Sequence, residues 1–173
     1  MKTKTPKESL TITTKIVLPN DTNPHGNLFG GQLLGWMDVT AAISAQRHSR
    51  RVVVTASVNN VSFGSPIKES DVVTLEAKVS RAFTSSMEVF IDVFVENQIS
   101  GVRVKHNEAI YTFVAVDQNG GPISVPQIEP ETKEEIERYE SALRRKQLSL
   151  ILAGKMKPQD ATELKRLFLP DGE

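Results

Sequence analysis

The sequence predicts an α+β domain in which a mainly antiparallel β-sheet wraps around one buried helix. One run of strand-forming residues precedes a long apolar helix candidate and four follow it. The connections among these four are too short for crossover helices, which favours antiparallel pairing. The helix candidate is too apolar to face water. A sheet that covers this helix is the economical arrangement, with two layers around one core.

The strands are predicted from the alternation of apolar or β-branched residues with polar ones, which puts every second side chain on one face of a sheet. Leu10–Val17 (LTITTKIV) shows this pattern and is ended by Pro19. The other four strands are predicted over residues 52–63, 71–81, 87–96 and 102–117, the last of them interrupted mildly at His106-Asn107.

The helix is predicted over Gln32–Gln46 (QLLGWMDVTAAISAQ), directly after two glycines and with no proline inside it. Helical spacing places Asp38 on one face with small or apolar residues, and most of the remaining surface is apolar as well. A helix of this kind is expected to be buried all round. The residues that share the face of Asp38 are Leu34, Ala41, Ala42 and Ala45.

The composition changes after Pro122. Pro126 and Pro130 indicate a stiff linker, and a charged helix with an acidic start and a basic end, which matches the helix dipole, is predicted over residues 131–147. Further short helical pieces are expected at 148–152 and 161–169. The sequence therefore predicts a main domain over residues 8–125, and a linker with a C-terminal helical extension over residues 126–173.

The charge balance and the amino-acid composition argue against several classes of binding partner and of functional site. The 173 residues include 21 Lys and Arg against 21 Asp and Glu, so no net field favours nucleic acid or a membrane surface. The absence of cysteine removes disulfides, thiolate metal sites and cysteine nucleophiles. The three histidines have no metal-ligand spacing, and no metal is expected. With neither a signal-like segment nor a membrane-spanning run in the sequence, we expect a cytoplasmic location and no membrane insertion.

One loop and its spacing from the helix resemble a known family. The loop Asp21–Gly31 (DTNPHGNLFGG), followed by Met37-Asp38, resembles the acyl-CoA thioesterases of the hotdog superfamily. Within this superfamily, the segment most resembles the bacterial acyl-CoA hydrolases that are related to the animal cytosolic brain-type enzymes. The resemblance covers about residues 10–125. It implies a hotdog fold, with a long central helix wrapped by a curved antiparallel sheet. It also implies homo-oligomers, with two active sites at each dimer interface and hexamers formed as trimers of dimers.

By this resemblance the catalytic carboxylate is Asp38 and a catalytic asparagine is Asn23, and the two meet from opposite subunits. Thioester hydrolysis needs an aimed water or carboxylate, so Asp38 would act either as general base or as nucleophile through an anhydride. The general base is favoured because it needs no reactive intermediate. Backbone amides of Gly30 and Gly31 at the helix start would stabilise the oxyanion. No cofactor is required, and coenzyme A enters only as part of the substrate and as product.

Helical periodicity alone leaves the role of Asp38 open, and Asn23 and Asn27 are also ordinary turn formers. His25 titrates in a useful range, but it is interpreted as a loop residue that shapes the pocket rather than as the base.

Coenzyme A binding is predicted from a turn and from basic residues. The stretch Ser80–Val89 matches a family segment that lies along the coenzyme, although relatives often carry Gly-Arg-Thr-Ser where this chain has Phe83 to Ser86. The arginine expected at Thr84 is therefore missing. Arg81 compensates, or else the cluster at the end of the charged helix does. The candidate contacts are Asn59 and Asn60 for the pantetheine amides, and Arg81, Thr84, Ser85, Ser86, Arg144, Arg145 and Lys146 for the rest.

The basic residues also have interpretations without a role in coenzyme binding. Arg81 would be a solvated charge at a strand end, and Arg144 to Lys146 would complement the helix dipole.

Two other functions remain open from the sequence. A hotdog hydratase or dehydratase acting on hydroxyacyl thioesters would use an acid and a base, and His25 with Asp38 would supply such a pair. A non-catalytic acyl-CoA-binding module, such as a ligand-gated regulator, would need a nucleic-acid-binding segment, and neither end of the sequence shows one. The pattern of Asn23 and Asp38 favours hydrolysis of fatty acyl-CoA.

Overall fold

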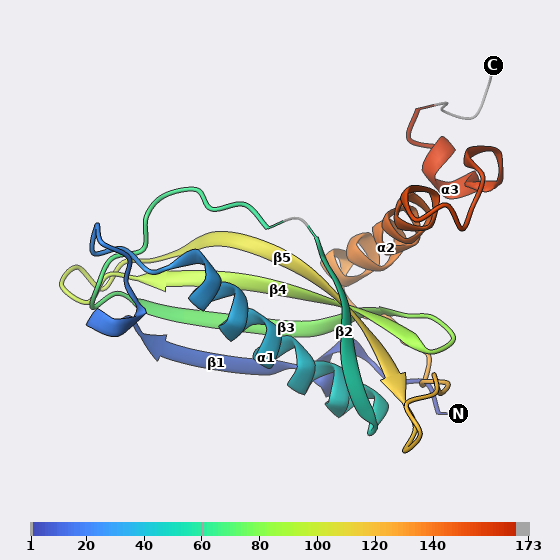
Figure 1. Ribbon diagram of the computed structural model, residues 1–173, viewed down its shortest axis with the longest axis horizontal. Coiled ribbons are helices and arrows are strands. Elements are labelled where there is room, and N and C mark those ends of the chain that lie inside the picture. The colour runs from blue at the N-terminus through green and yellow to red at the C-terminus, as the bar shows by residue number, and fades with distance from the viewer. Residues whose placement is uncertain (1, 60, 169–173) are drawn as a thin grey trace. The chain divides into compact units, whose positions relative to one another are not determined.

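The structure, a computed structural model, describes residues 2–59 and 61–168. The chain forms two compact units, residues 1–129 and 130–173, and each is described by itself (Figure 1). Within the described residues, no helix has an apolar stretch long enough to cross a bilayer.

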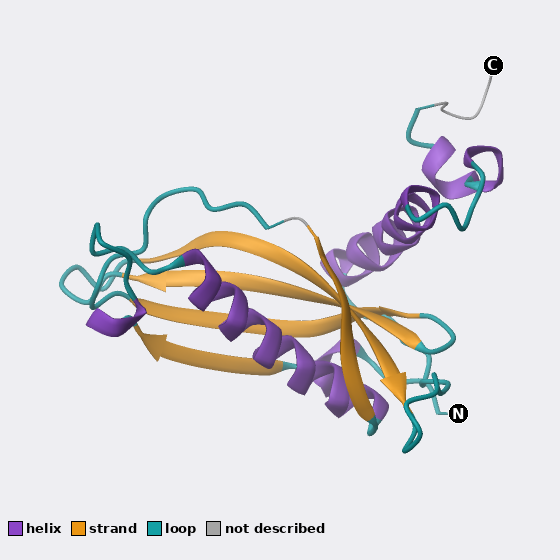
Figure 2. Ribbon diagram, in the orientation of Figure 1, coloured by secondary structure: helices purple, strands orange, loops and turns teal. Residues whose placement is uncertain are grey.

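The first unit contains a five-stranded sheet in which each pair of neighbours is antiparallel, as the short connections predict (Figure 2). The strand order is β1-β3-β4-β5-β2, so the last strand in the chain separates β2 from β4. The strands are β1 (Thr11–Ile16), β2 (Val52–Asn59), β3 (Val72–Ala82), β4 (Ser86–Glu96) and β5 (Arg103–Val116). The ends of each strand lie within one residue of the predicted ends, except β2, which ends four residues earlier than expected.

The helix α1 (Gly30–Ser49) packs against the curved sheet and contacts all five strands. Its sheet-facing side chains include Leu33, Met37, Ala41 and Ala45, each no more than 1% exposed. The alanines let the sheet approach closely, while burial of the larger side chains stabilises the fold by about 1.5–3 kcal/mol each. The helix ends at Arg50, whose φ of 55° is left-handed. The predicted hotdog arrangement of helix and sheet is therefore confirmed.

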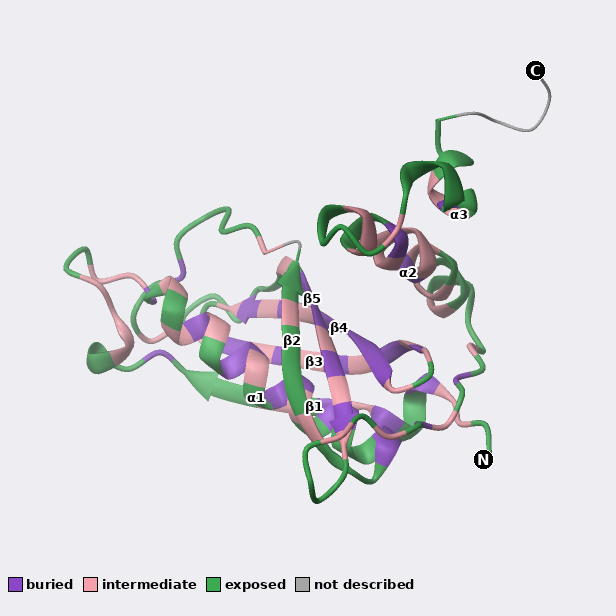
Figure 3. Ribbon diagram, turned by 45° about the vertical axis from the view of Figure 1, so that its right-hand side comes forward, coloured by how far each residue is buried: buried purple, intermediate pink, exposed green. Residues whose placement is uncertain are grey.

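Two details of the predicted helix are wrong. The helix begins at Gly30, so both glycines lie in its first turn instead of preceding it. Nor is it buried all round, because the sheet covers one side only and part of α1 is exposed (Figure 3). Val39 is 61% and Ile43 38% exposed. The adjacent strand β2 also exposes apolar residues, with Val52 65% and Val54 48% exposed.

The segment that follows the sheet is attached to the first unit by the N-terminal residues. Lys4 exchanges backbone hydrogen bonds with this segment, receiving one from Glu129 N and donating one to Gln127 O, at 2.9 and 3.0 Å. Nε2 of His48, near the end of α1, lies 2.7 Å from Pro126 O. These contacts explain why the first unit extends to residue 129.

The second unit consists of α2 (Lys133–Leu152), a 3₁₀ turn and the short α3 (Thr162–Lys165). A capping box opens α2, because Thr132 Oγ1 accepts from Glu135 N while the Glu135 carboxylate accepts from Thr132 N. Residues 148–152, predicted as a separate piece, form the last turn of α2. Gln147 Oε1 accepts the Leu164 N–H at 2.9 Å and ties α3 to α2.

Candidate active site

Asp38 lies on α1 beside β2 and is held by a side chain from that strand. The Thr55 hydroxyl donates a hydrogen bond of 2.8 Å to Asp38 Oδ1. Asp38 is partly buried and Thr55 is exposed in the single chain. Within residues 2–59 and 61–168, Oδ2 has no hydrogen-bond partner. The hydroxyl thus fixes one carboxylate oxygen and leaves the other available to a water or a substrate.

Tyr111 on β5 lies under the same turn of α1. Its hydroxyl donates a 3.0 Å hydrogen bond to Leu34 O, one turn before Asp38. Burial, and secondarily the negative charge of Asp38, raise the pKa of Tyr111 to about 12. Tyr111 therefore stays protonated at neutral pH, and it anchors the helix backbone where the carboxylate is carried.

The loop before α1 is closed by Asn23. Its Oδ1 accepts the backbone N–H groups of His25 and Asn27 at 2.9 and 3.3 Å, while Gly26 provides the left-handed φ of 72° that the turn requires. The Nδ2 group of Asn23 makes no hydrogen bond to any described residue. Asn23 therefore shapes its own loop through oxygen and offers two N–H donors through nitrogen.

Gly30 and Gly31 occupy the first two positions of α1. The first hydrogen bonds of the helix are donated by the N–H groups of Gln32 and Leu33 to Phe29 O. The N-cap residue Phe29 has no side-chain oxygen that could accept from the N–H groups of Gly30 and Gly31. The amides of both glycines thus lack an acceptor in the described part of the chain, at the positive end of the helix dipole. A β-carbon at Gly31 would lie 2.6 Å from the Phe29 ring, so a larger residue there would require this exposed ring to move.

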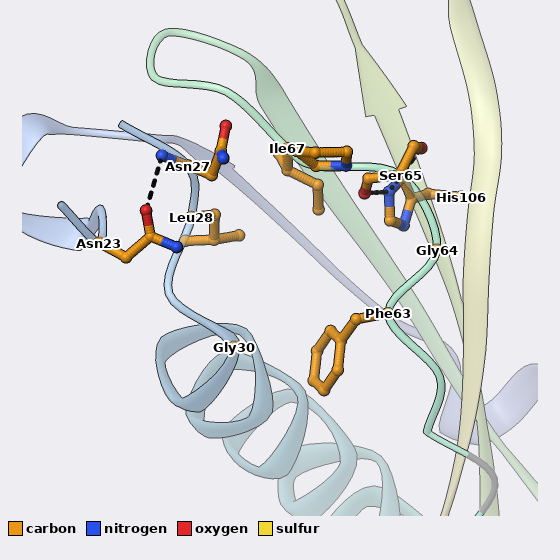
Figure 4. Close-up of a pocket in the computed structure, with 10 residues that line it drawn as sticks. Asn23, Asn27, Leu28, Gly30, Phe63, Gly64, Ser65, Ile67 and His106 are labelled. Atoms are coloured by element: carbon orange, nitrogen blue, oxygen red, sulfur yellow. Dashed lines mark hydrogen bonds between the residues drawn. The ribbon is translucent and has the colours of Figure 1, made fainter. Parts of the chain in front are cut away.

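A cavity of about 330 Å³ lies beside Asn23 and Gly30 (Figure 4). It is formed by the loop before α1, by the chain between β2 and β3, and by His106 on β5. Its lining comprises Asn23, Asn27, Leu28, Gly30, Phe63, Gly64, Ser65, Pro66, Ile67 and His106. The volume is within the range of small-molecule sites.

One chain does not bring all the predicted catalytic groups together. Asn23 and Gly30 line the same cavity, but Asp38 is not among its lining residues. Asp38 follows Gly30 by two turns of helix, which corresponds to about 12 Å along the axis. A thioester carbonyl bound at the amide of Gly30 is therefore remote from the carboxylate of the same chain.

The predicted coenzyme A contacts that the structure describes belong to several different elements. The turn between β3 and β4 is closed by the Phe83 N–H, which donates to Ser86 O at 2.8 Å, and leaves Thr84 exposed and Ser85 partly buried. Ser86 itself is only 7% exposed. Arg81 lies on β3 with its guanidinium carbon 5.6 Å from the centroid of the Phe83 ring.

Asn59 is exposed at the end of β2, and Asn60 lies outside the described residues. Arg144 and Arg145 belong to α2 in the second unit, where Arg144 donates to Ser141 Oγ and Arg145 donates to Arg138 O. Among the described residues, no group of His, Cys, Asp or Glu is arranged to hold a metal ion.

Thr55 is the site residue that the sequence did not reveal. A threonine in a β-strand is ordinary, since β-branched residues favour strands. Only the fold brings Thr55 next to Asp38. The register shift of β2 against β5 between Thr55 and Ser57 was equally invisible in the sequence.

Comparison with known proteins gives consistent matches. The model of the thioesterase superfamily matches residues 25–102. The uncharacterized acyl-CoA thioester hydrolase YkhA of Bacillus subtilis is 48% identical over 139 residues, which are 80% of this chain and 81% of YkhA. An apo-hexameric acyl-CoA thioesterase has a TM-score of 0.85 at 40% identity, covering 88% of this chain and 98% of that one.

The third comparison is with an acyl-CoA hydrolase of Staphylococcus aureus, whose structure contains butyryl coenzyme A and coenzyme A. It has a TM-score of 0.81 at 36% identity, with 88% of this chain and 95% of that one covered. The same enzyme has been solved with a single aspartate, asparagine or threonine replaced by alanine. With a matching superfamily model and relatives this similar over most of its length, the chain belongs to the acyl-CoA thioester hydrolases of the thioesterase superfamily.

Proposed function

We propose that this protein hydrolyses the thioester of fatty acyl-CoA, releasing the fatty acid and coenzyme A, with Asp38 as the catalytic carboxylate. The main observation in support is the hydrogen bond from Thr55 to Asp38, which orients the carboxylate and leaves its second oxygen available. The substituted asparagine, aspartate and threonine of the S. aureus enzyme are separated by 15 and 17 positions. Asn23, Asp38 and Thr55 have the same residue types in the same order at the same spacings.

In the proposed mechanism Asp38 is a general base. Oδ2 accepts a proton from a water molecule as its oxygen attacks the thioester carbonyl, and Thr55 keeps the carboxylate oriented. Collapse of the tetrahedral intermediate breaks the carbon–sulfur bond, and the proton held by Asp38 passes to the leaving thiolate. Direct attack by Asp38, which would form an anhydride and then need water to open it, is the alternative path.

The oxyanion is stabilised by donors that have no other partner in the described chain. The amides of Gly30 and Gly31 and the Nδ2 group of Asn23 lie at the rim of one cavity or beside it. Donors that are oriented before the reaction stabilise developing negative charge without reorganising, and one such donor contributes about 10²–10³-fold to turnover. The reaction balances with water, a carboxylate and these amides, so we propose no cofactor.

We further propose that each site is shared between two subunits. The separation of about 12 Å along α1 puts the carboxylate of one chain out of reach of its own oxyanion donors. A second copy packed on the exposed apolar faces of α1 and β2, which carry Val39 and Val54, would supply the missing group. Assembly into a hexamer of three such dimers is supported by hexameric acyl-CoA thioesterases of the same fold.

For coenzyme A we propose contacts at the β3–β4 turn, where Thr84 and Ser85 offer hydroxyls and Arg81 offers a charge. Ser86 contributes through its carbonyl, which closes the turn. Asn59 and Asn60 remain predicted pantetheine partners. Arg144 and Arg145 remain alternative phosphate partners in the second unit.

A hydrolysis screen over acyl-CoA chain lengths from acetyl to palmitoyl tests the proposal. Release of thiol is followed with a thiol-reactive dye, and hydration of an enoyl-CoA is measured in parallel. We expect thiol release with at least one acyl-CoA. Hydration without thiol release would identify a hydratase instead, and binding without either reaction would identify a non-catalytic module.

A further inference from the structure

The cavity beside Gly30 has one wall that comes from outside the helix and its preceding loop. This wall is the segment 61–67, which follows β2 and carries Phe63, Ser65 and Ile67. The segment has no regular secondary structure, and its last residue accepts a backbone hydrogen bond of 2.7 Å from Leu28 N to Ile67 O, which ties that end to the loop before α1.

The rest of the segment is held by side chains from a β-bulge in β5. The pairing of β4 with β5 steps from Val93–Asn107 to Phe94–Lys105, which makes His106 the extra residue of the bulge. A bulge of this kind bends the strand and redirects its side chains, and bulges often occur next to active sites. Here it directs His106 and Asn107 toward the segment 61–67.

The two side chains hold the segment on both sides of Phe63. Asn107 Nδ2 donates to Ser62 O at 3.0 Å, and His106 Nε2 donates to Ser65 O at 2.7 Å. The backbone of residues 62–65 is therefore fixed at two points, and the side chain between them is directed toward α1.

Phe63 faces the first residue of the helix. A β-carbon built on Gly30 would lie 3.4 Å from Cζ of Phe63 and 3.6 Å from both Cε atoms. The tip of the ring thus leaves space for about one carbon atom over the glycine backbone, beside the amides proposed to bind the oxyanion (Figure 4). The ring is 52% exposed, so it adds apolar surface that a ligand can cover.

The chemistry of the cavity fits the acyl group better than the nucleotide of coenzyme A. Leu28, Phe63, Pro66 and Ile67 give it an apolar side, and its lining contains neither lysine nor arginine. The phosphates of coenzyme A require cationic partners, whereas an acyl chain requires apolar contacts.

We infer that Phe63 is a specificity-determining residue, whose ring packs against the first methylenes of the acyl chain, and that His106 and Asn107 are positioning residues that hold it there. The inference rests on the proposed hydrolase function. It identifies the acyl-binding surface on the segment 61–67, and it assigns the bulge in β5 a role in chain-length selection.

The test compares kcat/KM for octanoyl-CoA and acetyl-CoA in wild type, Phe63→Ala, Phe63→Leu and a matched control, Phe168→Ala. Phe168 is also an exposed phenylalanine but lies in the second unit. Burial of one methylene is worth about a fourfold change in the binding constant, so loss of the contact with one or two methylenes lowers the octanoyl-to-acetyl ratio about tenfold in Phe63→Ala. Phe63→Leu should fall between Phe63→Ala and wild type, and the control should keep the wild-type ratio.

The positioning role is tested with Asn107→Ala, alone and combined with Phe63→Ala. If Asn107 acts through Phe63, Asn107→Ala lowers the same ratio, and adding it to Phe63→Ala changes the ratio no further. Equal losses for both substrates in Phe63→Ala would overturn the inference, because a wall for pantetheine or a general structural defect acts on all chain lengths alike. An unchanged ratio would also overturn it. A wild-type protein that hydrolyses no acyl-CoA from acetyl to palmitoyl would instead contradict the proposed function.

Discussion

The Thr55 hydroxyl, on β2, donates a 2.8 Å hydrogen bond to Oδ1 of Asp38, on α1. The two residues are 17 positions apart in the chain, and only the packing of β2 beside the helix brings them together. This contact gives the carboxylate one fixed and one available oxygen. The proposed catalysis depends on that asymmetry.

Replacement of Thr55 should therefore lower kcat more than it changes stability. A hydrogen bond to a charged group contributes about 1.5–3 kcal/mol, so Thr55→Ala is expected to lower kcat about tenfold to hundredfold. Thr55→Ser keeps the hydroxyl and should retain most of the activity, while Thr55→Val keeps the shape and should not. Equal activity of Thr55→Val and wild type in steady-state assays would remove Thr55 from the mechanism.

A shared site predicts complementation between two inactive variants. In a dimer that joins Asp38→Ala with Asn23→Ala, one site carries both substitutions and the other carries neither. Random exchange of subunits should then restore about a quarter of the wild-type activity, because half of the dimers are mixed and each mixed dimer has one intact site. The mixture is assayed after exchange has been verified by native mass spectrometry. No recovery in exchanged subunits would argue that each site lies within one chain.

The buried His48 predicts a loss of stability in acid. Burial lowers the pKa of His48 below its ordinary 6.5, and this effect outweighs the hydrogen bond with Pro126 O, which raises the pKa. Nδ1 is buried without a partner among the described residues, so the folded state does not readily accept a second ring proton. Below pH 6.5 the unfolded chain binds more protons than the folded one, and the free energy of unfolding falls with pH until the lowered folded-state pKa is passed.

Denaturant unfolding of wild type and His48→Gln at pH 7.5 and pH 5 measures this contribution. The glutamine amide can still donate to Pro126 O but does not titrate in this range. We expect wild type to lose more stability than His48→Gln between the two pH values. Equal losses would show that other groups cause the acid sensitivity.

The strands and the central helix could be predicted from the sequence because each has its own periodicity. Alternation marks β3 and β4 clearly, and a mainly apolar stretch with helical spacing and no proline marks α1. The exposure of Val39 and Ile43 could not be predicted, since it depends on how far the sheet extends around the helix. The start of the helix at Gly30 could not be predicted either, because two consecutive glycines are typical of a turn.

The site residues that belong to a sequence motif could be predicted. Those that reach the site only through tertiary contacts could not. The loop with Asn23 and the spacing to Asp38 identify the family, but Thr55 and Phe63 lie in a strand and a connection with no distinctive pattern. The partner subunit that we propose to complete the site belongs to the assembly, and the periodicity of one chain does not specify an assembly. The coenzyme contacts, the boundary between the two domains and the cytoplasmic location stay predictions.

The most direct test of the account is the turnover of Asp38→Asn, whose amide oxygen can still accept the Thr55 hydrogen bond but which has lost the base. Turnover and coenzyme A affinity are measured on the same preparation, by thiol release and by isothermal titration. We predict that kcat falls by at least about a thousandfold while coenzyme A still binds. Turnover close to that of wild type would contradict it.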